Sequence, residues 1–204
     1  MELLKLPTGT PKLNSKIQLT RNKKVPSYNL QDTKKSQIPI HKKQTTHKMQ
    51  IKQLLKANIK DIIELEKNNA PDKPYYARYD DKALNFIFDN PKTCHAIGLY
   101  DDDKLIGWGA YRTNWYRHSK EKGVEISSIV INKNYRRKGL GTVILNKIIS
   151  KLKENKIKNI FLTVSPLNVG ALILYSKNGF IIFDYKKDVY GLGSDRVYLR
   201  LSFI

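Results

Sequence analysis

The sequence IVINKNYRRKGLGTVILNKIISKL, from Ile129 to Leu152, organises the rest of the chain. A β-branched run, Ser127–Ile131, leads into it and predicts a strand. A polar turn follows, and apolar residues then recur with the period of roughly 3.6 residues that marks a helix with one buried face. The apolar positions of that helix are Leu140, Ile144, Leu145, Ile148, Ile149 and Leu152. The stretch therefore predicts a strand, a basic turn containing glycines, and a helix.

The turn combines three basic side chains with two glycines, in the order Arg136-Arg137-Lys138-Gly139-Leu140-Gly141. A helix N-terminus offers unpaired N–H groups and the positive end of the helix dipole, and glycine lets a ligand approach the backbone closely. These features favour an anion site suited to a pyrophosphate. The spacing is not that of GxxxxGK[ST], and Ile144 occupies the position where the dinucleotide fingerprint needs its third glycine. On these residues alone, a plain basic turn remains the alternative.

Composition limits the class of protein. The 204 residues carry a formal net charge of +20 and are 40% hydrophobic, which fits one domain with an extension. The charge favours an acidic partner such as a nucleic acid or a polyanionic cofactor. Cys94 is the single cysteine, so no intrachain disulfide forms, and the cytoplasm, with the nucleus as an alternative, is the expected compartment. We expect neither a membrane-spanning segment nor a metal site, because no apolar run or ligand spacing predicts one.

Residues 1–48 are predicted to be a disordered basic tail. They carry eleven Lys and Arg residues against Glu2 and Asp32, and prolines interrupt them repeatedly. They lack the sustained apolar periodicity that a packed core requires. A solvated tail is the simpler interpretation, and contact with a ribosome or a nucleic acid is the alternative.

The remaining residues, 49–204, are predicted to form one α/β (α+β) domain. Strands are expected over 49–54, 93–100, 104–112, 123–131, 159–164, 181–185 and 197–203, and helices over 59–67, 80–89, 140–152 and 168–178. Asn58 is expected to cap the first helix. The strands that flank the long helix require a parallel crossover, so we expect a mixed central sheet with helices on both faces.

A second motif follows the buried strand NIFLTV. It has the pattern V-x-x-x-N-x-x-A-x-x-L-Y-x-x-x-G-F, and it places Asn168 and Tyr175 about two helical turns apart on one face. Together with Arg136-x-x-Gly139-x-Gly141, it resembles the GNAT family of N-acetyltransferases over roughly residues 49–203. The order of predicted elements also matches that fold.

The resemblance implies acetyl-CoA as the cosubstrate. The strand residues Ile129, Val130 and Ile131 would pair with its pantetheine, and Asn168 would contact the pantetheine arm. The pyrophosphate loop would comprise Arg136, Arg137, Lys138, Gly139, Leu140, Gly141 and Thr142. Tyr175 would donate a proton to the departing CoA thiolate, a role that suits a phenol.

Glu125 is the candidate general base, because it lies fourteen residues before Gly139, as the base does in histone-acetylating relatives. A structural carboxylate is the alternative for this residue. Protein Nα-acetyltransferases place a tyrosine at the position of Glu125 and a histidine at that of Thr163. Thr163 cannot serve as a base at neutral pH, so the base is Glu125, a water chain, or none.

The acceptor is predicted to be the α-amine of a protein N-terminus. The turn Tyr75–Lys82 and the segment Lys186–Tyr190 resemble substrate-binding parts of Nα-acetyltransferases, which makes Tyr75, Tyr76, Tyr79 and Tyr190 the candidate substrate contacts. An α-amine of pKa near 8 is also easier to deprotonate than a lysine side chain, by roughly 3 kcal/mol. The alternatives are a small amine, a polyamine or lysine, and, from another class, an inactive module that binds nucleic acid or the ribosome.

Overall fold

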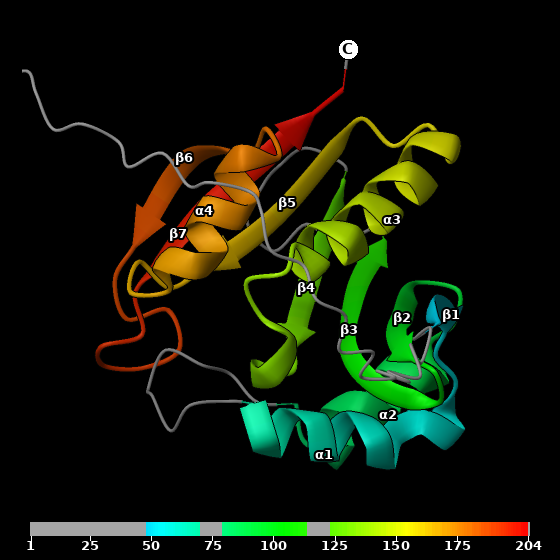
Figure 1. The fold of residues 1–204 in the computed structure, drawn as a ribbon. Helices are drawn as coiled ribbons and strands as arrows, with labels where there is room; N and C mark the ends of the chain where they lie inside the picture. Colours follow the sequence, from blue (N-terminus) through cyan, green and yellow to red (C-terminus); the bar gives the residue numbers. More distant parts are fainter. Residues whose placement is uncertain (1–47, 70–78, 114–122, 204) are drawn as a thin grey trace, which may run out of the picture. The chain divides into compact units, whose positions relative to one another are not determined.

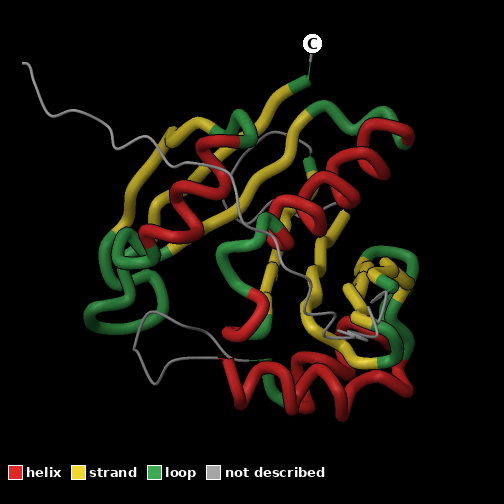
Figure 2. The backbone as a smooth tube through the Cα atoms, viewed as in Figure 1, coloured by secondary structure: helices red, strands yellow, loops and turns green. Residues whose placement is uncertain are grey.

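The computed structural model describes residues 48–69, 79–113 and 123–203. The chain divides into two units, 1–43 and 44–204, and the described residues all belong to the second. In chain order the elements are β1 (Met49–Gln53), α1 (Ile59–Asn69), α2 (Asp81–Asp89), β2 (Cys94–Asp101), β3 (Lys104–Thr113), β4 (Val124–Ile131), α3 (Leu140–Glu154), β5 (Asn159–Val164), α4 (Val169–Lys177), β6 (Ile181–Lys186) and β7 (Arg196–Ser202). Figures 1 and 2 show the strands as one sheet with helices packed on it.

The sheet has the strand order β1-β2-β3-β4-β5-β7-β6. The pair β4–β5 is parallel and the other neighbouring pairs are antiparallel. The parallel pair is the expected crossover, and α3 makes the connection. The predicted mixed sheet with helices on both faces is therefore confirmed.

Two hydrophobic clusters hold the helices on opposite faces of the sheet. One contains the buried side of α3, including Ile144, Ile148 and Leu152, and it extends to Tyr175 of α4. The other contains α1 and α2, which pack over Trp108 of β3. Burying one such aliphatic side chain contributes about 1.5–3 kcal/mol, so the apolar stripe predicted from the sequence is sufficient to dock α3.

The predicted cap of α1 was wrong. A 3-10 turn, Lys56–Asn58, precedes the helix, and the side-chain oxygen of Asn58 accepts a hydrogen bond from the N–H of Leu55 at 3.0 Å. The side chain of Asn58 therefore bonds to the start of the 3-10 turn before α1, and it is not the N-cap of α1 that the sequence predicted. Asp80 does cap α2, because its carboxylate accepts from the N–H of Ala83 at 2.8 Å.

The strands β4 and β5 pair over a short distance. Val124 pairs with Ile160 and Glu125 with Phe161, and no pair beyond these joins the two strands within the described part of the chain. The two strands therefore separate toward their carboxyl ends. The residues predicted to pair with pantetheine, Ile129–Ile131, lie on this separated part of β4.

Candidate active site

The basic turn has the open form that an anion site requires. Arg137 and Gly139 both adopt positive φ, +62° and +76°, and α3 begins at Leu140 directly after them. A Cβ added at Gly139 would meet no atom within 4 Å, so its surroundings are open and its backbone conformation is what favours glycine. The first N–H groups of a fifteen-residue helix therefore lie next to the exposed side chains of Arg137 and Lys138. This arrangement fits a pyrophosphate.

Arg136 behaves differently from its two basic neighbours. Its guanidinium donates to the carbonyl oxygen of Ile131 at 3.0 Å and to that of Asn69 at 2.8 Å. Its side chain thus ties the turn to the end of β4 and to the end of α1. A contact between Arg136 and a phosphate, which the resemblance implies, stays a prediction.

A β-bulge shapes the strand that leads to the turn. Ala110 pairs with Ser128 and Tyr111 with Ile126, so Ser127 is an extra residue in β4. Its carbonyl oxygen accepts a hydrogen bond from the hydroxyl of Tyr79 at 3.0 Å. The sequence carried a sign of this bulge, because the apolar alternation of Val124 and Ile126 resumes one position late, at Ile129.

Tyr175 lies in α4 and belongs to the same hydrophobic cluster as the buried side of α3. It is 7% exposed and packs edge-on against Phe180, with 5.5 Å between the ring centroids. A Cβ added at Gly141 would lie 3.4 Å from a methyl of the neighbouring Leu174, so the first turn of α3 is close to this part of α4. Burial raises the pKa of Tyr175 well above its ordinary value, so the phenol is protonated at neutral pH and is a weaker acid than an exposed tyrosine.

Asn168 caps α4, because its side-chain oxygen accepts from the N–H of Ala171 at 3.2 Å. Its predicted contact with the pantetheine arm is not tested by this geometry. Thr142, in the first turn of α3, is half-buried.

Glu125 lies on the face of the sheet opposite to α3 and α4. Its strand neighbours Val124 and Ile126 belong to the core under α3, so the side chain of Glu125 points to the other face. Arg112 of β3 and Phe161 of β5 flank it in the sheet. The negative charge of Glu125 raises the pKa values of Tyr79 and Tyr198, although burial is the main cause for both. Glu125 is therefore near both phenols.

Tyr79 is anchored in the core beneath the predicted acceptor side. Its ring packs edge-on against Trp108 at 5.2 Å, and the Trp108 indole N–H donates to the buried carboxylate of Glu66 at 2.8 Å. Burial raises the pKa of Tyr79 to about 12. With its hydroxyl bonded to Ser127, Tyr79 positions β4 in this structure, and its predicted contact with substrate remains to be tested.

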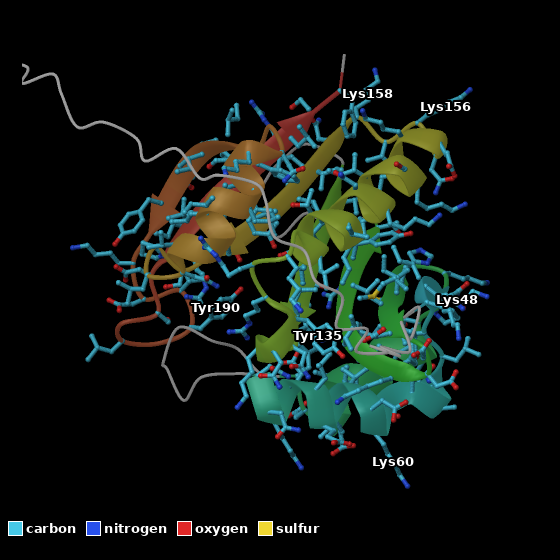
Figure 3. All side chains as sticks on the ribbon, viewed as in Figure 1. Lys48, Lys60, Tyr135, Lys156, Lys158 and Tyr190 are labelled. Atoms are coloured by element: carbon cyan, nitrogen blue, oxygen red, sulfur yellow. The ribbon has the colours of Figure 1, made fainter. Side chains whose placement is uncertain are left out.

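The loop between β6 and β7 carries Tyr190, which is labelled in Figure 3. Tyr190 is exposed, and the guanidinium of Arg196 lies 4.9 Å from its ring centroid. Tyr198 is a buried residue that the sequence analysis did not single out, and burial, followed by nearby negative charge that includes Glu125, raises its pKa. The predicted contacts Tyr75 and Tyr76 lie outside the described residues.

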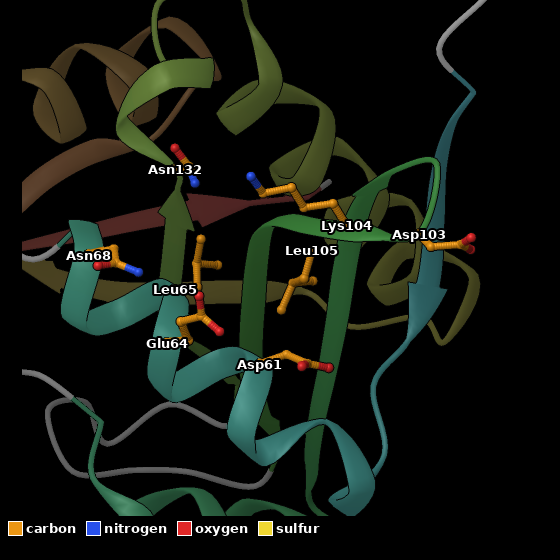
Figure 4. Close-up of a pocket in the computed structure, with 8 residues that line it drawn as sticks. All are labelled: Asp61, Glu64, Leu65, Asn68, Asp103, Lys104, Leu105 and Asn132. Atoms are coloured by element: carbon orange, nitrogen blue, oxygen red, sulfur yellow. The ribbon is translucent and has the colours of Figure 1, made fainter.

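A polar cavity of about 250 Å³ lies elsewhere, between α1 and the β2–β3 turn (Figure 4). It is lined by Asp61, Glu64, Leu65, Asn68, Asp103, Lys104, Leu105 and Asn132, none of which is a predicted site residue. Among the described residues, no three His, Cys, Asp or Glu side chains gather as metal ligands would. In the same part of the chain, every helix is too short or too polar to span a bilayer.

Comparison with known proteins supports the resemblance. Residues 57–180 match the model of the acetyltransferase (GNAT) family. Streptothricin acetyltransferase A of Bacillus subtilis is 32% identical over 110 residues, which cover 54% of this chain and 61% of that protein. The spermine/spermidine N(1)-acetyltransferase of the same species is 32% identical over 105 residues, covering 48% and 69%. The chain therefore spans about three fifths of the first relative's length.

Solved structures support the fold. The structure of Arabidopsis thaliana NAA60 in complex with acetyl-CoA matches with a TM-score of 0.64 at 14% identity, covering 76% of this chain and 98% of that one. An identity this low shows the fold alone. The family model, which covers more than half of the chain, shows more: the chain belongs to the acetyltransferase (GNAT) family.

Proposed function

We propose that the protein transfers the acetyl group of acetyl-CoA to a primary amine, and that this amine belongs to a small cationic molecule of the polyamine class. One observation carries the transfer: α3 begins with an open, basic N-terminus that fits the cosubstrate's pyrophosphate, and Leu174 of α4, the chain neighbour of Tyr175, lies near the first turn of that helix. The family model supports the same reaction. The relatives' activities on spermine, spermidine and streptothricin support the class of acceptor.

Each residue has a defined task in this proposal. The first turn of α3 and the side chains of Arg137 and Lys138 bind the pyrophosphate, and the separated part of β4 receives the pantetheine. The attacking nitrogen forms a bond to the acetyl carbon and loses its proton to Glu125, directly or through water. The carbon–sulfur bond breaks, and the phenol of Tyr175 supplies a proton to the thiolate.

The two classes of acceptor differ in how much they need a base, because their amines have different pKa values. An alkyl amine of pKa about 10.4 is almost fully protonated at neutral pH, so it must lose a proton to a base before it can attack. Glu125, whose side chain lies on the sheet face away from α3, is the residue we assign to this task. An α-amine of pKa near 8 needs less help. The second candidate is an Nα-acetyltransferase. It is supported by the tyrosines predicted to contact the acceptor, and one of these, Tyr190, is exposed.

Three acceptors separate the two candidates. The purified chain is incubated with acetyl-CoA and spermidine, with a lysine-free peptide that has a free N-terminus, or with an N-terminally blocked peptide that contains one lysine. Products are identified by mass spectrometry, and CoA release gives kcat/KM for each acceptor. We expect spermidine to have the highest kcat/KM.

Acetylation of the lysine-free peptide with spermidine left unmodified would replace the polyamine proposal by the Nα candidate. Acetylation of the blocked peptide alone would indicate a lysine acceptor. Failure of the chain to bind acetyl-CoA in calorimetry would overturn the acetyl transfer itself.

A further inference from the structure

Asn69, the last residue of α1, connects that helix to the turn after β4. It is 4% exposed, and it stands sixty-four residues before its partner Lys133 in the chain. Its amide nitrogen donates to the carbonyl oxygen of Leu65 at 2.6 Å, within α1. Its side-chain oxygen accepts from the N–H of Lys133, the first residue of the 3-10 turn that leads into the basic loop.

The backbone of Asn69 makes a second link to the same turn. Its carbonyl oxygen accepts from the guanidinium of Arg136, which also donates to the carbonyl oxygen of Ile131. The turn from Ile131 to Arg136 is therefore held at its start, middle and end, in part through one buried asparagine. Figure 4 shows the last turn of α1, with Asn68, next to the end of β4, where Asn132 lies.

The chemistry of these contacts is demanding. A buried amide needs a partner for both its N–H donors and its oxygen. Removal of the Asn69 side chain would leave the carbonyl of Leu65 and the N–H of Lys133 without this partner, which costs free energy where water has little access. Neighbouring Asn68 is exposed and lines the polar cavity instead. Asn69 therefore does more than end α1, because it also accepts a bond from Lys133.

We propose that Asn69 is a positioning residue for the pyrophosphate loop: it holds the turn Lys133–Tyr135 in place, so that Arg137, Gly139 and the first N–H groups of α3 are arranged before the cosubstrate binds. This inference rests on the proposed use of acetyl-CoA. Preorganised donors bind an anion more tightly than donors that must first be ordered, because the ordering has already been completed during folding. The residue acts on binding through the loop and touches no reacting atom.

The test compares Asn69→Ala with the matched control Asn68→Ala. Calorimetry gives the dissociation constant for acetyl-CoA, and thermal melting shows whether each variant remains folded. We expect Asn69→Ala to bind acetyl-CoA about tenfold more weakly, from the loss of a buried hydrogen bond, and Asn68→Ala to bind like the wild type. Equal dissociation constants for the wild type and a folded Asn69→Ala would overturn the proposal.

A truncated acetyl donor separates positioning from general damage. S-acetylpantetheine lacks the pyrophosphate, so the loop cannot help to bind it. We expect Asn69→Ala to lower kcat/KM for acetyl-CoA by about tenfold and to leave kcat/KM for S-acetylpantetheine unchanged. An equal loss with both donors would mean that Asn69 is merely structural.

A second variant keeps the test decisive if Asn69→Ala does not fold. Lys133→Pro removes the N–H that donates to Asn69 and leaves the bond from Asn69 to Leu65 in place, so it should bind acetyl-CoA about tenfold more weakly than the wild type. Wild-type affinity in a folded Lys133→Pro would contradict a role in the loop. If the wild type itself does not bind acetyl-CoA, the proposed function fails first, which is a different result.

Discussion

At the scale of single residues, burial raises the pKa values of two tyrosines in the candidate site. Desolvation is the first cause for both Tyr175 and Tyr79. Their environments differ, because the hydroxyl of Tyr79 donates to Ser127 whereas the ring of Tyr175 packs on Phe180. The hydroxyl of Tyr79 therefore holds β4 in place, whereas in our proposal the hydroxyl of Tyr175 protonates the leaving thiolate.

Tyr175→Phe should separate binding from turnover. The variant keeps the ring that packs on Phe180 and removes the proton donor, so kcat should fall about a hundredfold or more while the dissociation constant for acetyl-CoA stays the same. Steady-state kinetics and calorimetry measure the two quantities. Tyr111→Phe is the matched control, because Tyr111 is another buried tyrosine of the same cluster. An unchanged kcat in Tyr175→Phe would remove this residue from the reaction.

Glu125→Gln should change the pH profile as well as the rate. Without a base, turnover depends on the fraction of acceptor amine that is already neutral, so the deficit relative to the wild type should be largest at low pH and shrink as pH rises. A pH–rate profile of both proteins measures this, with Glu64→Gln on the exposed side of α1 as control. Parallel profiles for the wild type and Glu125→Gln would assign the carboxylate a structural role.

His95 gives a pH dependence of stability that is independent of catalysis. Its ring stacks on Tyr111 at 4.8 Å, and burial, followed by the positive charge of Lys151, lowers its pKa below 6.5. The unfolded chain then binds a proton more readily than the folded one, so stability should fall as pH drops below about 6.5. Urea unfolding above and below that pH should show a smaller difference for His95→Asn than for the wild type. An equal difference in both would show that other groups dominate.

At the scale of elements, the start of α3 depends on one backbone conformation. Gly139 has a φ of +76° and no neighbour that would clash with a side chain, so its role is conformational. A β-branched residue there would have to adopt a left-handed conformation that costs at least about 1–2 kcal/mol. The backbone would relieve this strain by rotating the first N–H groups of α3.

Gly139→Val should therefore weaken acetyl-CoA binding more than it weakens the fold. Gly193→Val is the matched control, because Gly193 has nearly the same φ, +77°, and open surroundings, but lies in the β6–β7 loop. Both variants should melt at similar temperatures, and calorimetry should show lost acetyl-CoA affinity for Gly139→Val alone. Similar affinities in the two variants would mean that the loop around Gly139 does not hold the pyrophosphate.

At the scale of the whole molecule, the charge is unevenly distributed along the sequence. Residues 1–48 contribute a net charge of about +9 in less than a quarter of the chain. Among the described residues, Lys48 is the first, and its N–H donates to Asp102 at 3.1 Å while its carbonyl accepts from the N–H of Asp102 at 3.2 Å. The domain boundary at residue 49 stays a prediction.

A chain that begins at Gln44, the first residue of the second unit, tests this boundary. It retains the contacts of Lys48, so we expect a cooperative thermal transition and the same kcat/KM for the acceptor as the full chain. Calorimetric melting and steady-state assays on both chains provide the comparison. Precipitation or loss of the cooperative transition would show that the tail contributes to the fold.

The sequence by itself determined the order of the elements, the basic turn and the position of Tyr175. These features rest on local rules: apolar periodicity, the conformational freedom of Gly139, and the spacing of residues along a helix. Such rules act within a few residues, so they can be recognised in the chain without its fold. They also predicted the crossover at α3, because parallel neighbours need a long connection.

The tertiary structure alone decided how the site is held together. Asn69 meets Lys133 and Arg136 across more than sixty residues, and Tyr79 reaches Ser127 across forty-eight. No local pattern marks these partners, because an asparagine at a helix end and a tyrosine after a loop have many possible contacts. Their contacts follow from the tertiary packing, which encloses the polar groups and requires each of them to find a partner.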